Sequence, residues 1–447
     1  MLKQKPQQYF LLIISFILYT VIGYGIERHQ TLPLLAFYFL LFVIFLLILC
    51  NRDTFQEQEL KFWISAAIIF RVSLLFSVPA LSDDFYRFIW DGRLLNAGYH
   101  PFAQIPSYYM THPVSIPGID AELYEKLNSK ETFTIYPPVS QFIFWLSVVL
   151  STGSVYGSVV VMKMIIFGFE LGTIWIFTKL LRHFKQSQTS ILIYALNPLV
   201  ILELTGNLHF EGFMIFFFLL GIFLLSRQKQ LASSLAYALS ICTKLIPLIF
   251  LPLLIRQLPW KQTIAYWAVT GVFTLLFFVP LLNMNIIHGL SSSLGYYFQR
   301  FEFNASIYYL VREAGYFIFG FNIIQSAGPV LAVIATILIL TISFRNLPSN
   351  FAADIDPGLF RKMLWCMLIY LLFTTTLHPW YIITLLTISV FTTYRFPLVW
   401  SGLIFLSYAG YTENAYNENL FLVAFEYIAV IAYLLYETVW MNRPDHF

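Results

Sequence analysis

The stretch "KFWISAAIIFRVSLLFSVPALSDDFYRFIWDGR", residues 61–93, changes from a long apolar run to a cluster of carboxylates and arginines. An apolar run of about 20 residues can span a bilayer as a helix. Such runs recur along the 447-residue chain, which is 59% hydrophobic and 11% charged, with a mean hydropathy of +0.74. A soluble protein of this length carries more charge. The sequence therefore predicts an all-α, polytopic integral membrane protein.

The apolar runs predict about 11–14 transmembrane helices within a single domain that covers residues 1–447. The clearest runs are 9–25, 31–50, 61–80, 156–181, 189–205, 212–226, 262–282, 327–344, 363–377, 380–393, 397–411 and 420–440.

Three further segments are ambiguous. Residues 136–152 are apolar but short, and we interpret them as a re-entrant or interfacial helix. Residues 231–255 contain Lys244 and Pro247 near their middle, which favours two half-helices that meet near Lys244. Residues 305–322 are amphipathic and are predicted to lie in the membrane interface.

The basic residues orient the predicted helices. Lysine and arginine are retained on the cytoplasmic side of a membrane. Lys3, Lys5 and Arg443 therefore predict that both termini are cytoplasmic, and residues 81–135 form the longest extracytoplasmic loop. Basic residues also mark the other predicted inside loops: Arg52, Lys61, Arg182, Lys185, Arg227, Lys229, Arg256, Lys261, Arg345, Arg361, Lys362 and Arg395.

Composition argues against several other classes. The net charge of +3 is too small to indicate a nucleic-acid partner, and membrane lipids are the expected surroundings. Cys50, Cys242 and Cys366 lie in or beside apolar runs without metal-ligand spacing, so we interpret them as core residues. We expect neither a cofactor nor a metal site.

The loop after residue 81 begins with the densest group of charges. On a helix that starts near Ser82, the side chains of Asp84, Arg87 and Asp91 share one face. Arg87 could then hold the carboxylate of Asp84 and keep it ionised. A purely structural alternative is that Ser82 or Asp83 caps the helix and Arg87–Asp91 is an ordinary i,i+4 pair.

Other polar residues are predicted at the same extracytoplasmic face. Each has a structural alternative, such as a turn, a helix cap or a snorkelling side chain. Their common sidedness indicates one substrate-binding region more strongly than any single residue. The candidates for substrate binding are Arg87, Asp91, Arg93, His209, Glu211, Lys244, Arg300, Asn304 and His378.

The loop resembles that of a known enzyme superfamily. "SDDFYRFIWDGRLLNAGYHPF", residues 82–102, followed by "YPPVSQ", resembles the first outer loop of GT-C glycosyltransferases. The similarity is greatest to bacterial polyprenol-phosphate-mannose-dependent mannosyltransferases. "KLIPLIFLPLL" (244–254), "FNASIYYL" (303–310) and "HPWY" (378–381) resemble later features of the same group.

The resemblance implies inverting transfer of a hexose, with mannose expected, from a polyprenyl-phosphate donor. The acceptor would be a glycolipid or glycan at the extracytoplasmic face of a bacterial inner membrane. An acidic residue of the first loop would be the general base, with Asp84 the first choice and Asp83 the second. Arg300, His378 and Lys244 would line the site for the donor phosphate, with Arg87 or Arg93 as alternatives.

Two other functions compete with this interpretation. A transporter or lipid-linked-sugar flippase would favour internal repeats and ionisable groups near the bilayer midplane. An O-antigen ligase or polymerase would carry its long catalytic loop later in the chain. The early loop at residues 81–135 and the one-sided polar residues favour the glycosyltransferase.

Overall fold

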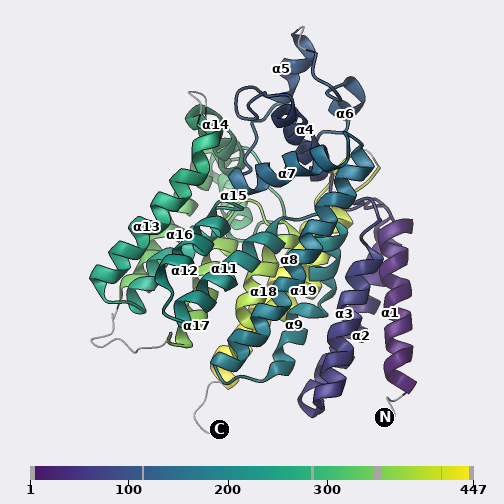
Figure 1. Cartoon of the computed structure of the whole chain (residues 1–447), viewed down its shortest axis with the longest axis vertical. Helices are drawn as coiled ribbons and strands as arrows, with labels where there is room; N and C mark the ends of the chain where they lie inside the picture. The colour runs from purple at the N-terminus through teal and green to yellow at the C-terminus, as the bar shows by residue number, and fades with distance from the viewer. Residues whose placement is uncertain (1–5, 113–114, 283–285, 346–354, 414, 442–447) are drawn as a thin grey trace.

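A computed structural model gives the fold, and it describes residues 6–112, 115–282, 286–345, 355–413 and 415–441 (Figure 1). Within these residues the chain is helical and has no β-strand. Two isolated bridges, Phe303–Thr376 and Tyr411–Tyr416, are its only β-type pairings there. The predicted all-α class is confirmed.

The helices differ widely in length. The α-helices are α1 (Pro6–Gly25), α2 (Thr31–Cys50), α3 (Glu57–Ser73), α4 (Asp84–Asn96), α5 (Pro106–Thr111), α6 (Ala121–Glu125), α7 (Pro138–Leu150), α8 (Val155–His183), α9 (Leu192–Ala195), α10 (Pro198–Val200), α11 (Glu211–Ser226), α12 (Gln230–Ile241), α13 (Trp260–Phe278), α14 (Ile286–Gln299), α15 (Ile307–Phe319), α16 (Ile324–Phe344), α17 (Gly358–Phe373), α18 (Ile382–Ser389), α19 (Phe396–Leu403) and α20 (Leu420–Tyr436). The 3₁₀ and π segments are η1 (Arg52–Thr54), η2 (Gln188–Ile191), η3 (Ile201–Gly206), η4 (Ile246–Arg256), η5 (Val279–Leu281), η6 (Pro379–Tyr381), η7 (Ile404–Gly410) and η8 (Glu437–Met441).

In the described part of the chain, 6 helices are long and apolar enough to cross a membrane, or up to 7 if one bent pair counts as a span. This number is below the predicted count because several apolar runs form short or broken helices, including α7, α11, η4 and α19–η7. The six are Pro6–Gly25, Thr31–Thr54, Val155–His183, Trp260–Leu281, Ile324–Phe344 and Leu420–Val439.

The ambiguous segments have distinct structures. Helix α12 ends at Ile241 and η4 begins at Ile246, so the predicted break at Lys244 is confirmed. Helix α7 has 13 residues, and Pro137 and Pro138 stand at its N-terminus, where a missing N–H does no harm. Residues 307–319 form a separate helix, α15, that leaves Leu310 and Phe317 exposed. Its position in the membrane interface stays a prediction.

Helix α1 begins at one end of the helical bundle, and α4, α5, α6 and α7 cover the opposite end (Figure 1). Basic side chains also hold connections between helices together. The guanidinium of Arg256, for example, donates to the carbonyl of Arg345 over 2.6 Å. Lys3, Lys5 and Arg443, which carry part of the orientation prediction, lie outside the described residues.

Inside the bundle, one arginine and one glutamate form a fully buried ion pair. Arg71 Nε lies 2.6 Å from Glu170 Oε2, and both side chains are 0% exposed. The hydroxyl of Tyr194 donates to the other oxygen of Glu170 over 2.5 Å. This network joins α3, α8 and α9. Lys163 of α8 instead donates to Ser77 Oγ and to the carbonyl of Leu74.

Candidate active site

Asp83 and Arg28 form an ion pair at the end of the bundle covered by α4. Asp83 stands at the N-cap position of α4, but its side chain makes no capping hydrogen bond. The N–H of Asp84 instead meets Ser82 Oγ at 3.3 Å. The predicted capping role of Asp83 is therefore wrong, because Arg28, after α1, takes its carboxylate.

Asp84 is the first residue of α4 and keeps partial exposure. Its Oδ1 accepts a hydrogen bond of 2.8 Å from Asn128 Nδ2. Burial raises the pKa of Asp84, and the Asn128 hydrogen bond opposes that rise, as does the charge of Lys244. The Asn128 amide thus orients the carboxylate of Asp84, which remains partly accessible. This arrangement suits a carboxylate that accepts a proton.

Arg87 does not hold Asp84, contrary to the sequence-based expectation. Its Nε lies 2.9 Å from Asp91 Oδ1, and these side chains are 4% and 0% exposed. Arg87 Nη1 also donates to the carbonyls of Ser129 and Thr132. The i,i+4 pair between Arg87 and Asp91 is therefore the correct interpretation, and the bonds from Arg87 to Ser129 and Thr132 fasten the loop at residues 81–135 to α4.

Asp91 and Arg93 have protein partners as well. Asp91 Oδ2 accepts a hydrogen bond of 2.9 Å from Gln141 of α7. Arg93 donates to the carbonyls of Gly118 and, over 2.7 Å, Gly153. With Arg87, they form the scaffold of the loop at residues 81–135, and their polar contacts leave Asp84 as the accessible acid of α4.

Lys244 and Glu211 form a second ion pair beside Asp84. Glu211 is 0% exposed and begins α11, whereas Lys244 lies in the break between α12 and η4. The first turn of α7 holds this break: the N–H of Val139 donates to the carbonyl of Cys242. Lys244 Nζ is also 5.4 Å from the ring centroid of Tyr381. The predicted candidates Lys244 and Glu211 therefore lie together.

His209 and His378 lie against Trp380. The ring centroids of His209 and Trp380 are 3.6 Å apart, and those of His378 and Trp380 are 4.5 Å apart and nearly parallel. Burial and the nearby Lys244 lower the pKa of His378 to about 3. Burial also lowers the pKa of His209. Both imidazoles are therefore expected to be neutral near pH 7 and to act as hydrogen-bonding groups, and the role of His378 at the phosphate site stays a prediction.

His378 is placed by a backbone pairing of two distant segments. The N–H of Leu377 donates to the carbonyl of Phe303 over 2.8 Å, and the N–H of Phe303 donates to the carbonyl of Thr375. Arg300 directly follows α14, precedes Phe301 in the chain and is exposed. The Phe301 ring centroid is 6.1 Å from that of His378. Arg300 is therefore close to the site in the chain, with its role still a prediction.

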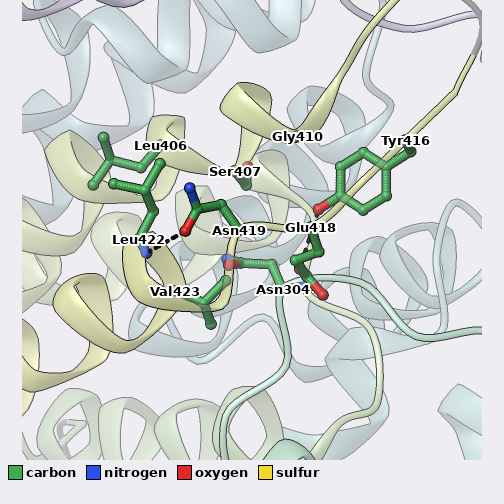
Figure 2. A pocket seen from close by; sticks show the side chains of 9 residues that line it. All are labelled: Asn304, Leu406, Ser407, Gly410, Tyr416, Glu418, Asn419, Leu422 and Val423. Atoms are coloured by element: carbon green, nitrogen blue, oxygen red, sulfur yellow. Dashed lines mark hydrogen bonds between the residues drawn. The ribbon is translucent and has the colours of Figure 1, made fainter.

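Asn304 belongs to a different cluster. Its Nδ2 donates to Glu426, its N–H donates to Glu418, and its carbonyl accepts from Tyr427. These bonds hold it at a φ of 45°, which is uncommon for a residue other than glycine. Figure 2 shows it lining a small pocket with Ser407 and Glu418. The structure thus gives Asn304 a positioning role for the 303–304 segment.

Three residues near the site were not predicted from the sequence: Arg28, Asn128 and Glu203. Arg28 pairs with Asp83, Asn128 with Asp84, and the Oε2 of Glu203 is 3.6 Å from His209 Nε2. Only Glu203 carried a usable signal, since a carboxylate inside an apolar run is a functional suspect. Across the described chain, no group of three or more His, Cys, Asp or Glu is arranged to hold a metal ion.

Comparison with known proteins identifies the family. Residues 17–258 match the family model described as "Alpha-(1->6)-mannopyranosyltransferase, N-terminal domain". Alpha-(1->6)-mannopyranosyltransferase A of Mycobacterium tuberculosis is 25% identical over 355 residues, which are 74% of this chain and 65% of that protein. Its namesake from Corynebacterium glutamicum is 24% identical over 186 residues, 41% of this chain and 36% of that protein.

The chain thus spans less than two thirds of the length of these relatives. The family match covers more than half of the chain and includes the loop at residues 81–135, with Asp83 and Asp84, as well as Glu211 and Lys244. It confirms the resemblance to GT-C mannosyltransferases that the sequence motifs indicated. This chain belongs to the alpha-(1->6)-mannopyranosyltransferase family.

Proposed function

We propose that this protein transfers a mannosyl group from a polyprenyl-phosphate donor to a hydroxyl of a glycolipid or glycan, at the extracytoplasmic face of a bacterial inner membrane. The names of the relatives support mannose and an α-(1→6) linkage. The observation that carries the proposal is the placement of Asp84, an accessible carboxylate, beside the cation Lys244 at one end of a membrane bundle.

The reaction follows from these groups. The acceptor O–H loses its proton to Asp84 while its oxygen forms a bond to the anomeric carbon. The bond from that carbon to the phosphate oxygen breaks, and the electron pair leaves with the polyprenyl phosphate. Attack opposite the leaving group inverts the anomeric centre. Lys244 stabilises the negative charge of the departing phosphate, and the N–H groups of His209 or His378 can donate to it.

Product analysis tests this proposal directly. Purified protein is incubated with polyprenyl-phosphate-mannose, polyprenyl-phosphate-glucose and a panel of mannolipid acceptors, and products are identified by mass spectrometry and linkage analysis. We expect α-(1→6)-mannosylated product from the mannose donor alone. Transfer from a nucleotide sugar without a lipid donor would contradict the proposed donor class.

A transporter is not favoured by the charges inside the bundle. Such a protein needs ionisable groups that face a substrate path near the membrane midplane. Arg71 and Glu170 are fully buried and bonded to each other, and Lys163 is bonded to Ser77. They join helices to one another, whereas the accessible acid lies at the end of the bundle.

Cysteine labelling tests the orientation. Thr111→Cys and Lys229→Cys are compared in a Cys50→Ser background, because Cys50 is exposed and Cys242 and Cys366 are buried. Both target positions are exposed, and they lie in the outer loop and in a basic connection. An impermeant thiol reagent should label Thr111→Cys in intact cells and Lys229→Cys only after lysis. The reverse pattern would overturn the proposed orientation.

Removal of Asn128 should change the pH dependence of transfer. The Asn128 hydrogen bond lowers the pKa of Asp84 against the raising effect of burial. In Asn128→Ala the pKa of Asp84 rises, so the acid limb of kcat/KM moves to higher pH and activity recovers toward the wild-type value at alkaline pH. Lys130→Gln is a control in the same loop, because Lys130 pairs with Glu125. An unmoved acid limb would mean that Asn128 does not tune the base.

A further inference from the structure

The turn that precedes α11 has an unusual backbone. Residues 201–206 form the π-helical segment η3, and π segments are rare and frequent at functional sites. Leu208 has a φ of 63°, in the left-handed region that non-glycine residues seldom adopt. The N–H of His209 donates to the carbonyl of Glu203 over 3.2 Å, which brings their side chains together. The proposed reaction so far gives Glu203 no role.

Two buried polar atoms face each other in this turn. Glu203 Oε2 and His209 Nε2 are 3.6 Å apart, and their side chains are 0% and 3% exposed. Neither atom has a hydrogen-bond partner within the described residues, whereas Glu203 Oε1 accepts a 2.8 Å bond from Tyr408. A buried carboxylate without a cation beside it is strongly disfavoured. The pair is therefore expected to hold one proton.

The charged and titratable groups around the pair determine whether the proton is more favourable on Glu203 or on His209. Lys244 and His378 face His209, and Glu211 and Tyr408 face Glu203. Lys244 is already neutralised by Glu211, so a phosphate anion bound there would meet little net positive charge. An imidazolium at His209 would supply a local positive charge, which the carboxylate left on Glu203 balances. Trp380, whose ring lies against His209, would stabilise the cation through its π face.

We propose that Glu203 and His209 share one proton, which moves from Glu203 Oε2 to His209 Nε2 when a phosphate anion binds beside Lys244. A carboxylic acid and a neutral imidazole become a carboxylate and an imidazolium, and no other bond changes. The pair has zero net charge before and after the transfer, so its burial is tolerated in both states. This inference rests on the proposed function, because it requires a phosphate-bearing donor and product.

The test uses the full chain in lipid nanodiscs, with undecaprenyl phosphate as the probe. Infrared difference spectra should show that binding of the probe removes the C=O band of a protonated carboxylic acid. That change should be missing in Glu203→Gln, whose amide oxygen can still accept the Tyr408 hydrogen bond. Glu203→Gln should bind the probe about 10- to 100-fold more weakly, the range for loss of a charge-assisted hydrogen bond.

His209→Phe keeps an aromatic ring against Trp380 but removes the proton acceptor, so it should weaken binding by a similar factor. The double variant should be no weaker than either single variant, because both changes remove one shared interaction. Thr205→Val is the matched control: Thr205 Oγ1 is another buried atom without a partner in the same described turn. Its affinity for the probe should equal that of the wild type.

Normal affinity in both Glu203→Gln and His209→Phe, or an unchanged C=O band in the wild type, would overturn the shared proton. These binding results do not depend on turnover. They therefore separate this inference from the proposed function, which instead fails if the wild-type protein transfers no mannose from any polyprenyl-phosphate donor.

Discussion

Asp84→Asn should lower kcat about 10²–10⁴-fold, the usual cost of losing a general base. Asparagine has nearly the same shape as aspartate, and its Oδ1 can still accept the hydrogen bond from Asn128. The variant should therefore fold and bind the lipid donor normally, while its amide cannot take the proton of the acceptor. Transfer of labelled mannose, measured beside donor binding, tests both parts.

Two comparison variants make this result interpretable. Asp120→Asn is a matched control in the same loop, because Asp120 caps α6 through Leu123 and asparagine is an equally good cap. It should keep wild-type activity. Asp83→Asn weakens the pair with Arg28 but leaves the base, so its loss should be smaller than that of Asp84→Asn. A larger loss in Asp83→Asn would exchange the two roles.

Arg71→Leu should destabilise the fold by about 3–5 kcal/mol, as expected when one member of a buried ion pair is removed. Glu170 would keep the hydrogen bond from the hydroxyl of Tyr194 but would lose its ion pair with the guanidinium of Arg71, whose Nε lies 2.6 Å away. Arg71 also bonds to the carbonyls of Ala67 and Ala195, so α3 and α9 would lose a connection. Thermal unfolding in detergent should show the loss as a lower Tm.

The double variant Arg71→Leu/Glu170→Leu should recover much of this stability, because it leaves no unpaired charge in the bundle. Lys61→Met is the control on the same helix α3. Lys61 and Glu57 form an exposed i,i+4 pair, 71% and 79% accessible, and such pairs contribute little. Its Tm should not change measurably. A double variant no more stable than Arg71→Leu would show that packing, and not charge, holds these helices together.

Local spacing was sufficient to predict part of the site. The apolar runs gave the helical membrane fold, and the interruption by Lys244 and Pro247 predicted the break between α12 and η4. The i,i+4 spacing likewise predicted the Arg87–Asp91 ion pair as one of two alternatives. Within one helix, the backbone geometry alone fixes which side chains are neighbours. Nothing in that spacing, however, could decide whether Arg87 turned toward Asp84 or Asp91.

The remaining contacts join segments that are remote in the chain. Arg28 reaches Asp83 from the connection between α1 and α2, and Asn128 reaches Asp84 from the later part of the loop at residues 81–135. Charge and polarity mark such residues as candidates, but their partners depend on how the helices pack. His378 shows the same limit, because the burial that lowers its pKa is a property of the folded site.

The contact between Arg28 and Tyr411 has a consequence for the biogenesis of the protein. Arg28 lies just after α1, and its guanidinium carbon is 4.9 Å from the ring centroid of Tyr411, which precedes α20. A nascent chain emerging from the ribosome inserts the helix before Arg28 long before Tyr411 has been translated. The ring contact of Arg28, the partner of Asp83, can therefore form only after residue 411 has been synthesised. Chains that stop before Tyr411 would lack this contact, so the Arg28–Asp83 pair would stand without it.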